Sequence, residues 1–524
     1  MIAEILVFVL TTLLVYILYT YKNFHYYLDQ RGVKYMPGLP LFGNIYKSMF
    51  MRRHMWEDFD AVYKAFPNER YVGFIEPTTL ALMIRDPELI KAITIKDFDH
   101  FTDHRAFFSE EAEPVLSGNL LLMKGQKWHD MRATLSPAFT SSKMKHMMPF
   151  MMEIGENIVE YLKDHHSQDI DLNDIIRRYT NDVIASTGFG LQVNSLKDKD
   201  NDFYNIGQNL FKLTISQRLG FLGLIFFPEL SKKLKLRVFP EKVTNFFKYL
   251  VTSTMEYREK NNVERPDMIQ LLMEAYKGTL NHNADSVEKD IGFATTEEAL
   301  KPQGPVRKWT QDELCGQMFV FFAAGFESTA SILVLCLHEL TLKPKIQETL
   351  YQEIKEFKQK NPNLTYDNIS KLKYLDCVVN ETLRKWSPAI RMDRICVKPY
   401  ELPPPREGAQ PYRLKPGDIV YNSLNSIHMD PKYYPQPDIF DPDRFSDENK
   451  HKIKPLTFIP FGLGPRNCIG SRYALLELKV LLYQLVLNFK ILKCAKTSEV
   501  VELTPKEFNF KVKGGSWVRM EIRH

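Results

Sequence analysis

Residues 458–479, FIPFGLGPRNCIGSRYALLELK, set a single cysteine between a glycine-rich turn and a run of leucines. Gly462 and Gly464 permit a tight, closely approaching backbone. After Gly470, leucines recur at steps of three and four residues, which is typical of one face of a helix. We therefore expect Cys468 on a loop just before a helix N-terminus, where the helix dipole and backbone N–H groups lower the pKa of a thiol.

An isolated thiolate has three main uses: attacking nucleophile, thiol redox centre or metal ligand. A nucleophile needs a nearby histidine base, and no histidine in the sequence stands in an obvious relation to Cys468. Redox exchange needs a second cysteine, and the nearest one, Cys494, comes after the far end of the expected helix. Iron ligation by Cys468 is the use that remains.

The loop also carries a recognisable pattern, FxxGxRxCxG, at Phe461, Gly464, Arg466, Cys468 and Gly470. It resembles the haem-binding loop of the cytochrome P450 superfamily, in which a cysteine thiolate is the proximal ligand of haem iron. Three further motifs occur in that family's order, and the resemblance runs from the N-terminal segment to the C-terminus. The stretches RMDRICVKPY, FTSSKMKHMMPF and PFGLGPRNCIGSRYAL are most similar to insect microsomal members related to broad-substrate detoxification enzymes.

The first of these motifs, WHDMR, puts Trp128 and Arg132 four residues apart on one helical face, like the family's propionate-binding helix. The resemblance implies that Trp128, Arg132, Arg391 and Arg466 hold the haem propionates, since guanidinium groups bind carboxylates in a bidentate manner. It also implies that Phe461 packs near the sulfur and tunes its electron donation.

The second motif, AGFES at residues 324–328, resembles the family's oxygen-activation motif, in which an acid and a hydroxyl relay protons. Here those residues are Glu327 and Ser328. The family usually has threonine where this chain has Ser328, so we expect a working relay with leakier coupling. The alternative is a serine that bends the helix by bonding to its own backbone. Thr329 lies about 100 degrees further around the helix and is not expected to substitute directly.

The third motif, ETLR at residues 381–384, resembles a helix whose glutamate and arginine form a triad with a later arginine, here Arg444 in FDPDRF. The resemblance implies a structural network of Glu381, Arg384 and Arg444, which is needed for haem incorporation. By position in the family, the substrate pocket is implied to include Phe107, Phe108, Phe322, Ala324, Ala389 and Ile390.

A long helix must position the AGFES motif. Thr310 with Glu313 predicts a capping box at its start, and the helix is expected to run to about Leu342, roughly 45 Å. Its middle is apolar nearly all round. A second membrane span is the alternative, but Glu327 at its centre would cost about 2.5 to 3.5 kcal/mol. We therefore expect a buried core helix.

The N-terminal residues predict a membrane anchor. Residues 2–21 are almost unbroken apolar, and about 20 helical residues suffice to cross a bilayer. A cleaved signal peptide is the competing interpretation, but bulky Tyr19 and Tyr21 are followed by basic residues, which place the body in the cytosol. We expect an anchor over residues 1–22, a Pro/Gly-rich linker over 23–44 and one catalytic domain over 45–524.

The length, net charge and cysteine content of the chain fit this class of protein. A 524-residue chain can bury a large core, and a formal charge of +5 is too small for its length to predict nucleic-acid binding. The six cysteines have no CxxC pairs, which predicts reduced thiols. Residues 71–86 read as a β-hairpin and residues 278–308 as a surface loop, within a mainly α fold that has a small β-sheet region.

The resemblance implies a membrane-anchored haem-thiolate monooxygenase of the endoplasmic reticulum with haem b (iron protoporphyrin IX). Electrons would come from NADPH through NADPH-cytochrome P450 reductase, docked on the face nearest Cys468, with cytochrome b5 as a second candidate donor. The substrates would be lipophilic small molecules that are hydroxylated or epoxidised. A peroxide-rearranging isomerase and a non-enzymatic haem protein are the two alternatives.

Overall fold

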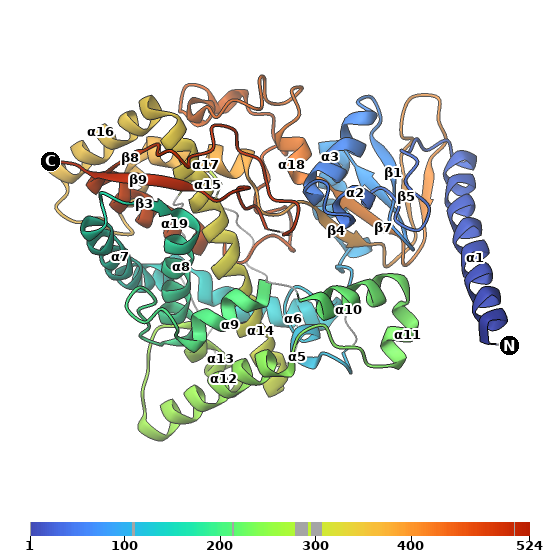
Figure 1. Ribbon diagram of the computed structural model, residues 1–524, viewed down its shortest axis with the longest axis horizontal. Helices are drawn as coiled ribbons and strands as arrows, with labels where there is room; N and C mark the ends of the chain where they lie inside the picture. Colours follow the sequence, from blue (N-terminus) through green and yellow to red (C-terminus); the bar gives the residue numbers. More distant parts are fainter. Residues whose placement is uncertain (1, 107–109, 212–213, 278–291, 295–306, 508) are drawn as a thin grey trace.

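The computed structural model describes residues 2–106, 110–211, 214–277, 292–294, 307–507 and 509–524. Figure 1 shows a helical body beside a smaller β-rich part, with the first helix standing out from the β-rich part. The α-helices are α1 (Ile2–Gln30), α2 (Tyr46–Met49), α3 (Met55–Ala65), α4 (Pro87–Lys91), α5 (Pro114–Ser117), α6 (Gly125–Leu135), α7 (Ser141–Asp164), α8 (Leu172–Phe189), α9 (Asp202–Phe211), α10 (Ile215–Phe226), α11 (Pro228–Lys233), α12 (Glu241–Asn261), α13 (Met268–Lys277), α14 (Gln311–Ala323), α15 (Thr329–Leu342), α16 (Pro344–Lys360), α17 (Lys373–Lys385), α18 (Leu424–His428) and α19 (Ser471–Asn488). The strands are β1 (Tyr71–Ile75), β2 (Leu80–Ile84), β3 (Asp169–Asp171), β4 (Met392–Ile395), β5 (Tyr400–Leu402), β6 (Tyr412–Leu414), β7 (Ile419–Asn422), β8 (Phe489–Leu492) and β9 (Trp517–Ile522).

The predicted hairpin forms the edge of a four-stranded sheet with the order β1-β2-β7-β4. In it β1 pairs antiparallel with β2, with Tyr71 opposite Ile84, and β7 joins parallel to β2. The apolar strand residues are buried on both faces, which is why these runs do not alternate strictly with polar residues. Two smaller sheets, β3-β9-β8 and β5-β6, complete the small β content that the sequence predicted.

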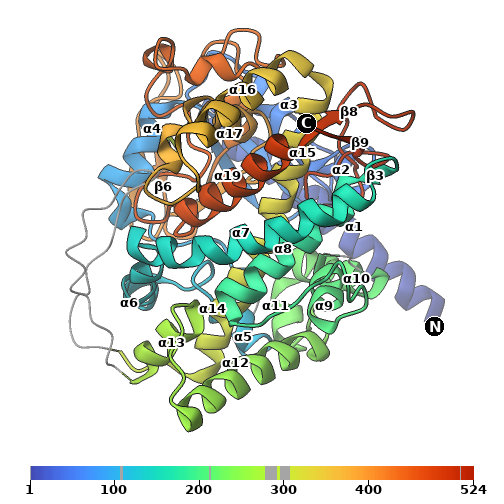
Figure 2. The same cartoon turned by 90° about the vertical axis from the view of Figure 1, so that its left-hand side faces the viewer.

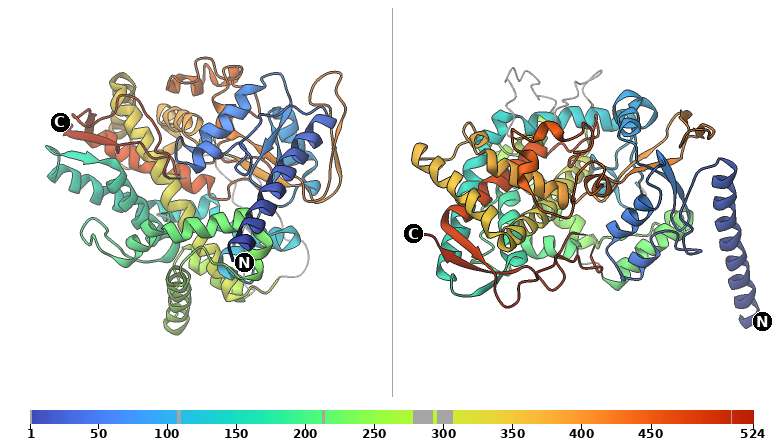
Figure 3. Two further views of the ribbon diagram at one scale, coloured as in Figure 1. Left: turned by 45° about the vertical axis from the view of Figure 1, so that its right-hand side comes forward. Right: turned by 90° about the horizontal axis from the view of Figure 1, so that it is seen from above.

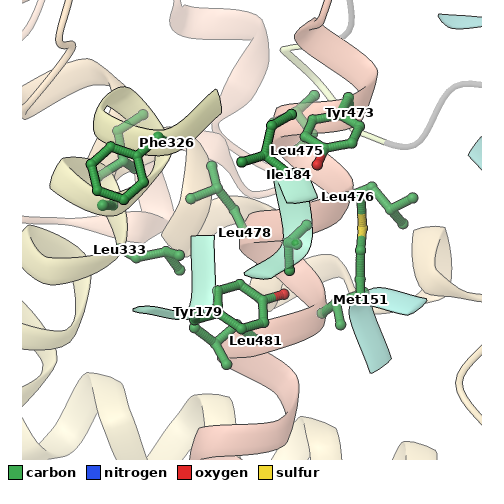
Figure 4. Close-up of a cluster of buried hydrophobic side chains, with 14 of the residues drawn as sticks. Met151, Tyr179, Ile184, Phe326, Leu333, Tyr473, Leu475, Leu476, Leu478 and Leu481 are labelled. Atoms are coloured by element: carbon green, nitrogen blue, oxygen red, sulfur yellow. The ribbon is translucent and has the colours of Figure 1, made fainter. Parts of the chain in front are cut away.

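The helix that follows Cys468 is α19, and it lies at the centre of the helical body. Figure 2 shows α19 running between α17 on one side and α7 on the other. Its leucines are buried, as the steps of three and four predicted. Figure 4 shows Leu475, Leu478 and Leu481 packed among Tyr179 and Ile184 of α8 and Leu333 of α15. The loop of Cys468 is thereby fixed to the largest core of the protein.

The long helix begins and ends as predicted, but it is not uniform. Thr310 is the N-cap, and both hydrogen bonds of the capping box with Glu313 are present. After α14 the chain makes one π-helical turn at Ala324–Ser328, labelled η4, before α15 continues to Leu342. Among the described residues, Gln311–Leu342 is the stretch long and apolar enough to span a membrane, and 72% of its most apolar window is buried. It is therefore the core helix that the sequence predicted.

The first helix reaches into the segment predicted as a linker. Helix α1 continues from the apolar N-terminal residues to Gln30, so residues 23–30 are helical rather than part of a Pro/Gly-rich linker. The reason is packing, because Leu28 and Val33 are buried in the core of the β-rich part. The N-terminal half of α1 extends away from the domain in Figures 1 and 3. The predicted surface loop at 278–308 lies mostly outside the described residues.

Candidate active site

A cavity of about 540 Å³ lies between the long helix and the loop of Cys468. The long helix supplies Ala324, Gly325, Ser328 and Thr329 to one wall, and the loop supplies Phe461 and residues 466–470 to the other. Most of the remaining wall is apolar. It includes Leu121, Phe139, Ile184, Val320, Phe321, Ile332, Leu383, Pro388, Ala389 and Met392.

The loop that presents Cys468 depends on its glycines. Gly462 and Gly464 have φ values of +79° and +73°, a region that disfavours other residues. A Cβ on Gly464 would lie 1.9 Å from the backbone oxygen of Thr94, so the close approach predicted from the sequence is present. The backbone N–H of Cys468 donates to the carbonyl of Phe461 at 2.8 Å and closes the turn just before α19.

The sulfur of Cys468 faces this cavity, whereas four of the other five cysteines are buried in the protein core. The Cys468 side chain is accessible from this cavity but is surrounded by protein atoms, and this burial raises the pKa of its thiol. A hydrogen bond from the Gly470 N–H and the charge of Arg132 only partly offset this rise. The predicted net lowering of the pKa by the helix N-terminus is therefore wrong, because desolvation raises the pKa by more than the helix N-terminus lowers it. A coordinated metal ion would remove the thiol proton.

Arg466 and Trp128 line the same cavity as Cys468 and form a stacked pair. The guanidinium of Arg466 lies 3.9 Å from the centre of the Trp128 ring. It donates to the backbone carbonyls of Thr102 and Met123 at 2.8 and 2.7 Å. Arg132, one helical turn after Trp128, donates to the backbone and side-chain oxygens of Asn467 at 2.8 and 2.5 Å. The residues predicted to bind the propionates, Trp128, Arg132 and Arg466, therefore also connect the loop of Cys468 to α6.

The buried guanidinium groups supply the test of whether haem fits. Arg394 is fully buried, and its Nε and Nη2 have no hydrogen-bond partner among the described residues. Burial lowers the pKa of Arg394 to about 10. Burial and the charges of Arg394 and Arg132 lower the pKa of Arg466 as well. Such desolvated cations favour an anionic ligand. Arg394 lies behind the wall, whereas Arg132 and Arg466 line the cavity together with Cys468. Carboxylates on a porphyrin whose iron meets the Cys468 thiolate match these lining residues, so the residues present fit haem.

Arg394 and its neighbours were missed in the sequence. Asp393 and His104 line the cavity, and the His104 ring lies 3.3 Å from the Asp393 carboxylate. The signal that could have found Asp393 and Arg394 is the run RMDRI, which places charged residues in strand β4, paired antiparallel with β7. Arg391, which was predicted, also lines the cavity. The Arg391 guanidinium lies 3.7 Å from the Glu76 carboxylate and 4.7 Å from the centre of the Tyr421 ring.

Glu327 and Ser328 share the π-helical turn but face different surroundings. The Glu327 carboxylate is not among the groups that line the described cavity and forms a bidentate pair with Arg177 of α8, at 3.1 and 2.5 Å. Ser328 lines the cavity, and its hydroxyl donates to the carbonyl of Ala324 one turn earlier. Thr180 of α8 donates to the carbonyl of Phe326 at 2.9 Å and holds the wide turn in place. The backbone-bonded serine weighed from the sequence is therefore present.

The predicted substrate residues divide into three groups. Ala324 and Ala389 line the cavity. Phe322 does not, since it is fully buried and stacks on Phe326 at 5.5 Å, and its neighbour Phe321 takes the cavity-facing position. Ile390 is also absent from the described lining, because it packs against the core of the β-rich part and against a small apolar cluster that includes Leu335 and Trp386. Phe107 and Phe108 lie outside the described residues.

Glu381, Arg384 and Arg444 lie together away from the cavity. Arg384 donates twice to Glu381, at 2.7 and 2.8 Å, and both side chains are fully buried. The backbone N–H of Asp441 donates to the same carboxylate at 2.8 Å, and Arg444 Nε lies 3.6 Å from it. The network therefore ties α17 to the irregular segment that precedes the loop of Cys468. Burial raises the pKa of Glu381, and Arg384 opposes this rise.

Comparison with known proteins defines the class to which this fold and site belong. The family model described as Cytochrome P450 matches residues 33–517. The chain belongs to the cytochrome P450 family and is a haem-thiolate monooxygenase.

Its curated relatives are insect proteins. Cytochrome P450 9e2 of Blattella germanica is 41% identical, with 98% of this chain and 96% of that protein aligned. Probable cytochrome P450 9f2 of Drosophila melanogaster is 40% identical, with 95% of each chain aligned. Cytochrome P450 6k1 of Blattella germanica is 33% identical, with 95% of this chain and 93% of that protein aligned. The resemblance drawn from the motifs is confirmed.

Proposed function

We propose that this protein uses dioxygen and electrons from NADPH to hydroxylate or epoxidise lipophilic small molecules, with haem b as its cofactor. One oxygen atom would enter the product and the other would leave as water, which consumes two electrons and two protons. The observation that carries the proposal is the cavity that joins the Cys468 sulfur, the stacked Arg466 and an apolar wall from the long helix.

The protein residues have separate roles in this proposal. Cys468 would ligate the iron, while Arg132, Arg466, Arg391 and Trp128 would hold the propionates. Bound haem would supply dioxygen activation, which a thiolate ligand promotes by donating electron density. The carbonyl of Phe461 holds the Cys468 N–H, so the loop keeps the sulfur directed at the cavity.

The apolar lining supports a lipophilic substrate. Val320, Phe321, Ile332 and Leu383 face the same cavity as the sulfur and offer no charge to a ligand. Transferring apolar surface from water onto such walls contributes roughly 25 cal/mol per Å². Charged groups gather instead at the side of Arg466, where the propionates would lie. The identity of the substrate is therefore a matter of shape and apolar area rather than of charge.

Glu327 and Ser328 remain our proposed proton-relay residues, and the structure sets conditions on both. Glu327 can pass a proton toward the cavity only after its carboxylate leaves Arg177. The Ser328 hydroxyl must rotate away from the Ala324 carbonyl. Each step breaks hydrogen bonds, and each broken bond costs about 0.5 to 3 kcal/mol. This cost supports the expectation that NADPH oxidation is imperfectly coupled to product formation.

We also propose that α1 anchors the protein in the endoplasmic reticulum membrane with the domain on the cytosolic side. Large apolar side chains of α1 are exposed, among them Val7, Phe8 and Val15 at 62%, 71% and 61%. NADPH-cytochrome P450 reductase, with cytochrome b5 as a second candidate, would dock on the face nearest Cys468. No nucleic-acid partner is proposed.

The test uses the full-length, haem-loaded protein in lipid vesicles with ¹⁸O₂, NADPH, reductase and a panel of lipophilic toxins and terpenoids. The expected result is a product that carries one ¹⁸O atom and forms only when reductase and NADPH are both present. Turnover of a hydroperoxide without reductase, with no ¹⁸O taken from the gas, would instead establish the isomerase. Absence of any oxidised product across the panel, despite reduction of the protein, would favour a haem carrier.

A further inference from the structure

A second cavity, of about 820 Å³, lies where the helical body meets the β-rich part. Helix α3 lines one side of it, and the ends of α15 and α17 line another. Residues 499–503, in the dark red C-terminal segment of Figure 1, form a third side. Among the described residues, none lines both this cavity and the cavity of Cys468. A ligand held here would therefore occupy a site of its own.

Part of the wall of this second cavity is aromatic and apolar. Trp386, which follows α17, packs with Leu335 and Leu503 in a small cluster, and Trp56 of α3 packs against the same cluster. Both tryptophans and Leu503 line the cavity. Indole rings offer a large contact area at a low cost in side-chain entropy. The volume is within the range of pockets that hold small organic ligands.

The charged part of the wall has two ammonium groups on one carboxylate. Glu339 of α15 is 1% exposed, and it accepts from Lys343 Nζ at 2.6 Å and from Lys385 Nζ at 2.8 Å. The indole N–H of Trp386 donates to the same carboxylate at 3.0 Å. Burial raises the pKa of Glu339, but the two ammonium groups lower it by more, so the carboxylate stays ionised. This cluster therefore has one more positive charge than negative charges.

The two ammonium groups also have donors that the protein does not use. An ammonium group carries three N–H bonds, and Lys343 and Lys385 each use one side-chain hydrogen bond among the described residues. Their side chains are 30% and 13% exposed, so both are partly removed from water. Lysines suit the C-terminal ends of α15 and α17, but a helix end does not require a tryptophan-lined cavity beside it. Partly desolvated cations with unused donors favour an anionic acceptor.

The other charged residues of the wall are paired or exposed. The ion pairs are Glu502 with Lys513, Glu499 with Lys493, Asp60 with Lys64 and Arg53 with Asp58, at 2.9, 2.8, 2.7 and 2.5 Å. Glu57 accepts from the backbone N–H of His54 at the start of α3. Arg52 and Asp438 are exposed and opposite in charge. The cluster around Glu339 is therefore the place in this wall where cations outnumber acids.

We propose that the second cavity binds an organic anion, a carboxylate or phosphate ester whose charged end meets Lys343 and Lys385 and whose apolar body lies against Trp56 and Trp386. The inference goes beyond the proposed function and does not depend on it, because the two cavities have no described lining residue in common. An anion without an apolar body should bind weakly, since both ammonium groups already share the Glu339 carboxylate.

The first test is calorimetric titration of naphthalene-2-carboxylate and 1-naphthyl phosphate into the full-length, haem-loaded protein in lipid nanodiscs, with empty nanodiscs as the blank. The wild type should bind at least one of these probes saturably, and its visible haem spectrum should stay unchanged. The neutral 2-naphthamide should bind roughly tenfold or more weakly than the carboxylate, as expected for the loss of charge-assisted hydrogen bonds. Acetate and inorganic phosphate should compete only weakly.

Variants of the two lysines test the charged end of the site. Lys343→Met and Lys385→Met should each weaken binding of the naphthyl anions roughly tenfold or more. Each single variant leaves Glu339 with one ammonium partner, so both variants should fold. Lys511→Met is the matched control and should bind as the wild type does. Lys511 also pairs with a glutamate four residues earlier and is 29% exposed, but it lies outside the cavity lining.

A pair of variants at Val500 tests the charge without touching the buried cluster. Val500 lines the cavity and is 68% exposed, so replacing it should leave the fold intact. Val500→Glu should weaken binding of the naphthyl anions, whereas Val500→Lys should preserve or strengthen it. The opposite order would overturn the proposal.

The remaining outcomes also decide the matter. Absence of saturable binding of both probes, or tighter binding of 2-naphthylmethylamine than of the carboxylate, would contradict an anion site. A probe that shifts the haem absorption as it binds would lie in the catalytic cavity, which also contradicts the proposal. Lysine variants that lose stability but bind as the wild type does would show that the lysines serve only the helix ends. None of these results depends on oxygen-dependent turnover, so a failure here is distinct from a failure of the proposed function.

Discussion

Glu381→Gln should destabilise the protein far more than its small change in shape suggests. In the native protein, Arg384 is fully buried and its two bonds to Glu381 are 2.7 and 2.8 Å long. Glutamine would keep one acceptor oxygen but remove the negative charge, leaving a buried cation. Removing one partner of a buried pair costs about 3 to 5 kcal/mol. Arg384 retains the carbonyls of His428 and Pro437, at 2.9 and 2.8 Å, so we expect the lower end, about 3 kcal/mol.

The assay is chemical unfolding of the purified, haem-loaded protein at neutral pH, with haem content measured on the same preparation. A loss of about 3 kcal/mol corresponds to roughly a hundredfold change in the folding equilibrium constant. The matched control is Glu401→Gln, which breaks the pair between Arg413 and Glu401, at a similar distance of 2.9 Å but with side chains 85% and 53% exposed. That variant should cost less than about 1 kcal/mol. Equal shifts in the two variants would refute the burial argument.

Three further predictions concern single residues. Gly464→Ala should lower both the haem content and the soluble yield, because the added Cβ would lie 1.9 Å from a backbone oxygen. Gly408→Ala is the control, since Gly408 has a similar φ but open space around it, and it should retain both. Absorbance of the purified protein measures the haem content of each variant. Ser328→Thr should lower hydrogen peroxide release per NADPH oxidised, since the added methyl restricts the hydroxyl rotamer; unchanged or greater release would contradict this. Burial raises the pKa of Asp182 from 3.8 to about 6, so the folded state binds this proton more tightly than the unfolded chain. Its contribution to the free energy of unfolding should therefore fall as pH rises through that interval, and denaturation of Asp182→Asn should lack this slope.

Features encoded by a few neighbouring residues could be predicted from the sequence. The capping box at Thr310 and Glu313, the hairpin of β1 and β2, and the Cys468 loop before α19 all form as expected. Each depends on local geometry, namely a cap, a turn or a glycine with positive φ. The pair of Glu381 and Arg384 is local in the same way, because the two residues lie one helical turn apart. Arg444 lies far along the chain, and its place in the triad was implied by the family resemblance and is formed by the fold.

Directions of side chains on the long helix could not be predicted in this way. The π-helical turn at Ala324–Ser328 changes the angular spacing, so counting with 3.6 residues per turn misplaces the side chains of the next turns. Phe322 packs into the core while Phe321 faces the cavity, and Thr329 lines the cavity together with Ser328. Nor could the sequence predict that burial raises the pKa of the Cys468 thiol by more than the helix N-terminus lowers it, because desolvation depends on the whole fold.

The most direct test of the account is the absorption spectrum of the reduced protein with carbon monoxide. We expect the red-shifted Soret band diagnostic of a thiolate bound to haem iron, lost in Cys468→Ser and retained in Cys494→Ser. A folded protein that binds no haem, or a carbon monoxide complex without that shift, would contradict ligation by Cys468 and with it the proposed chemistry.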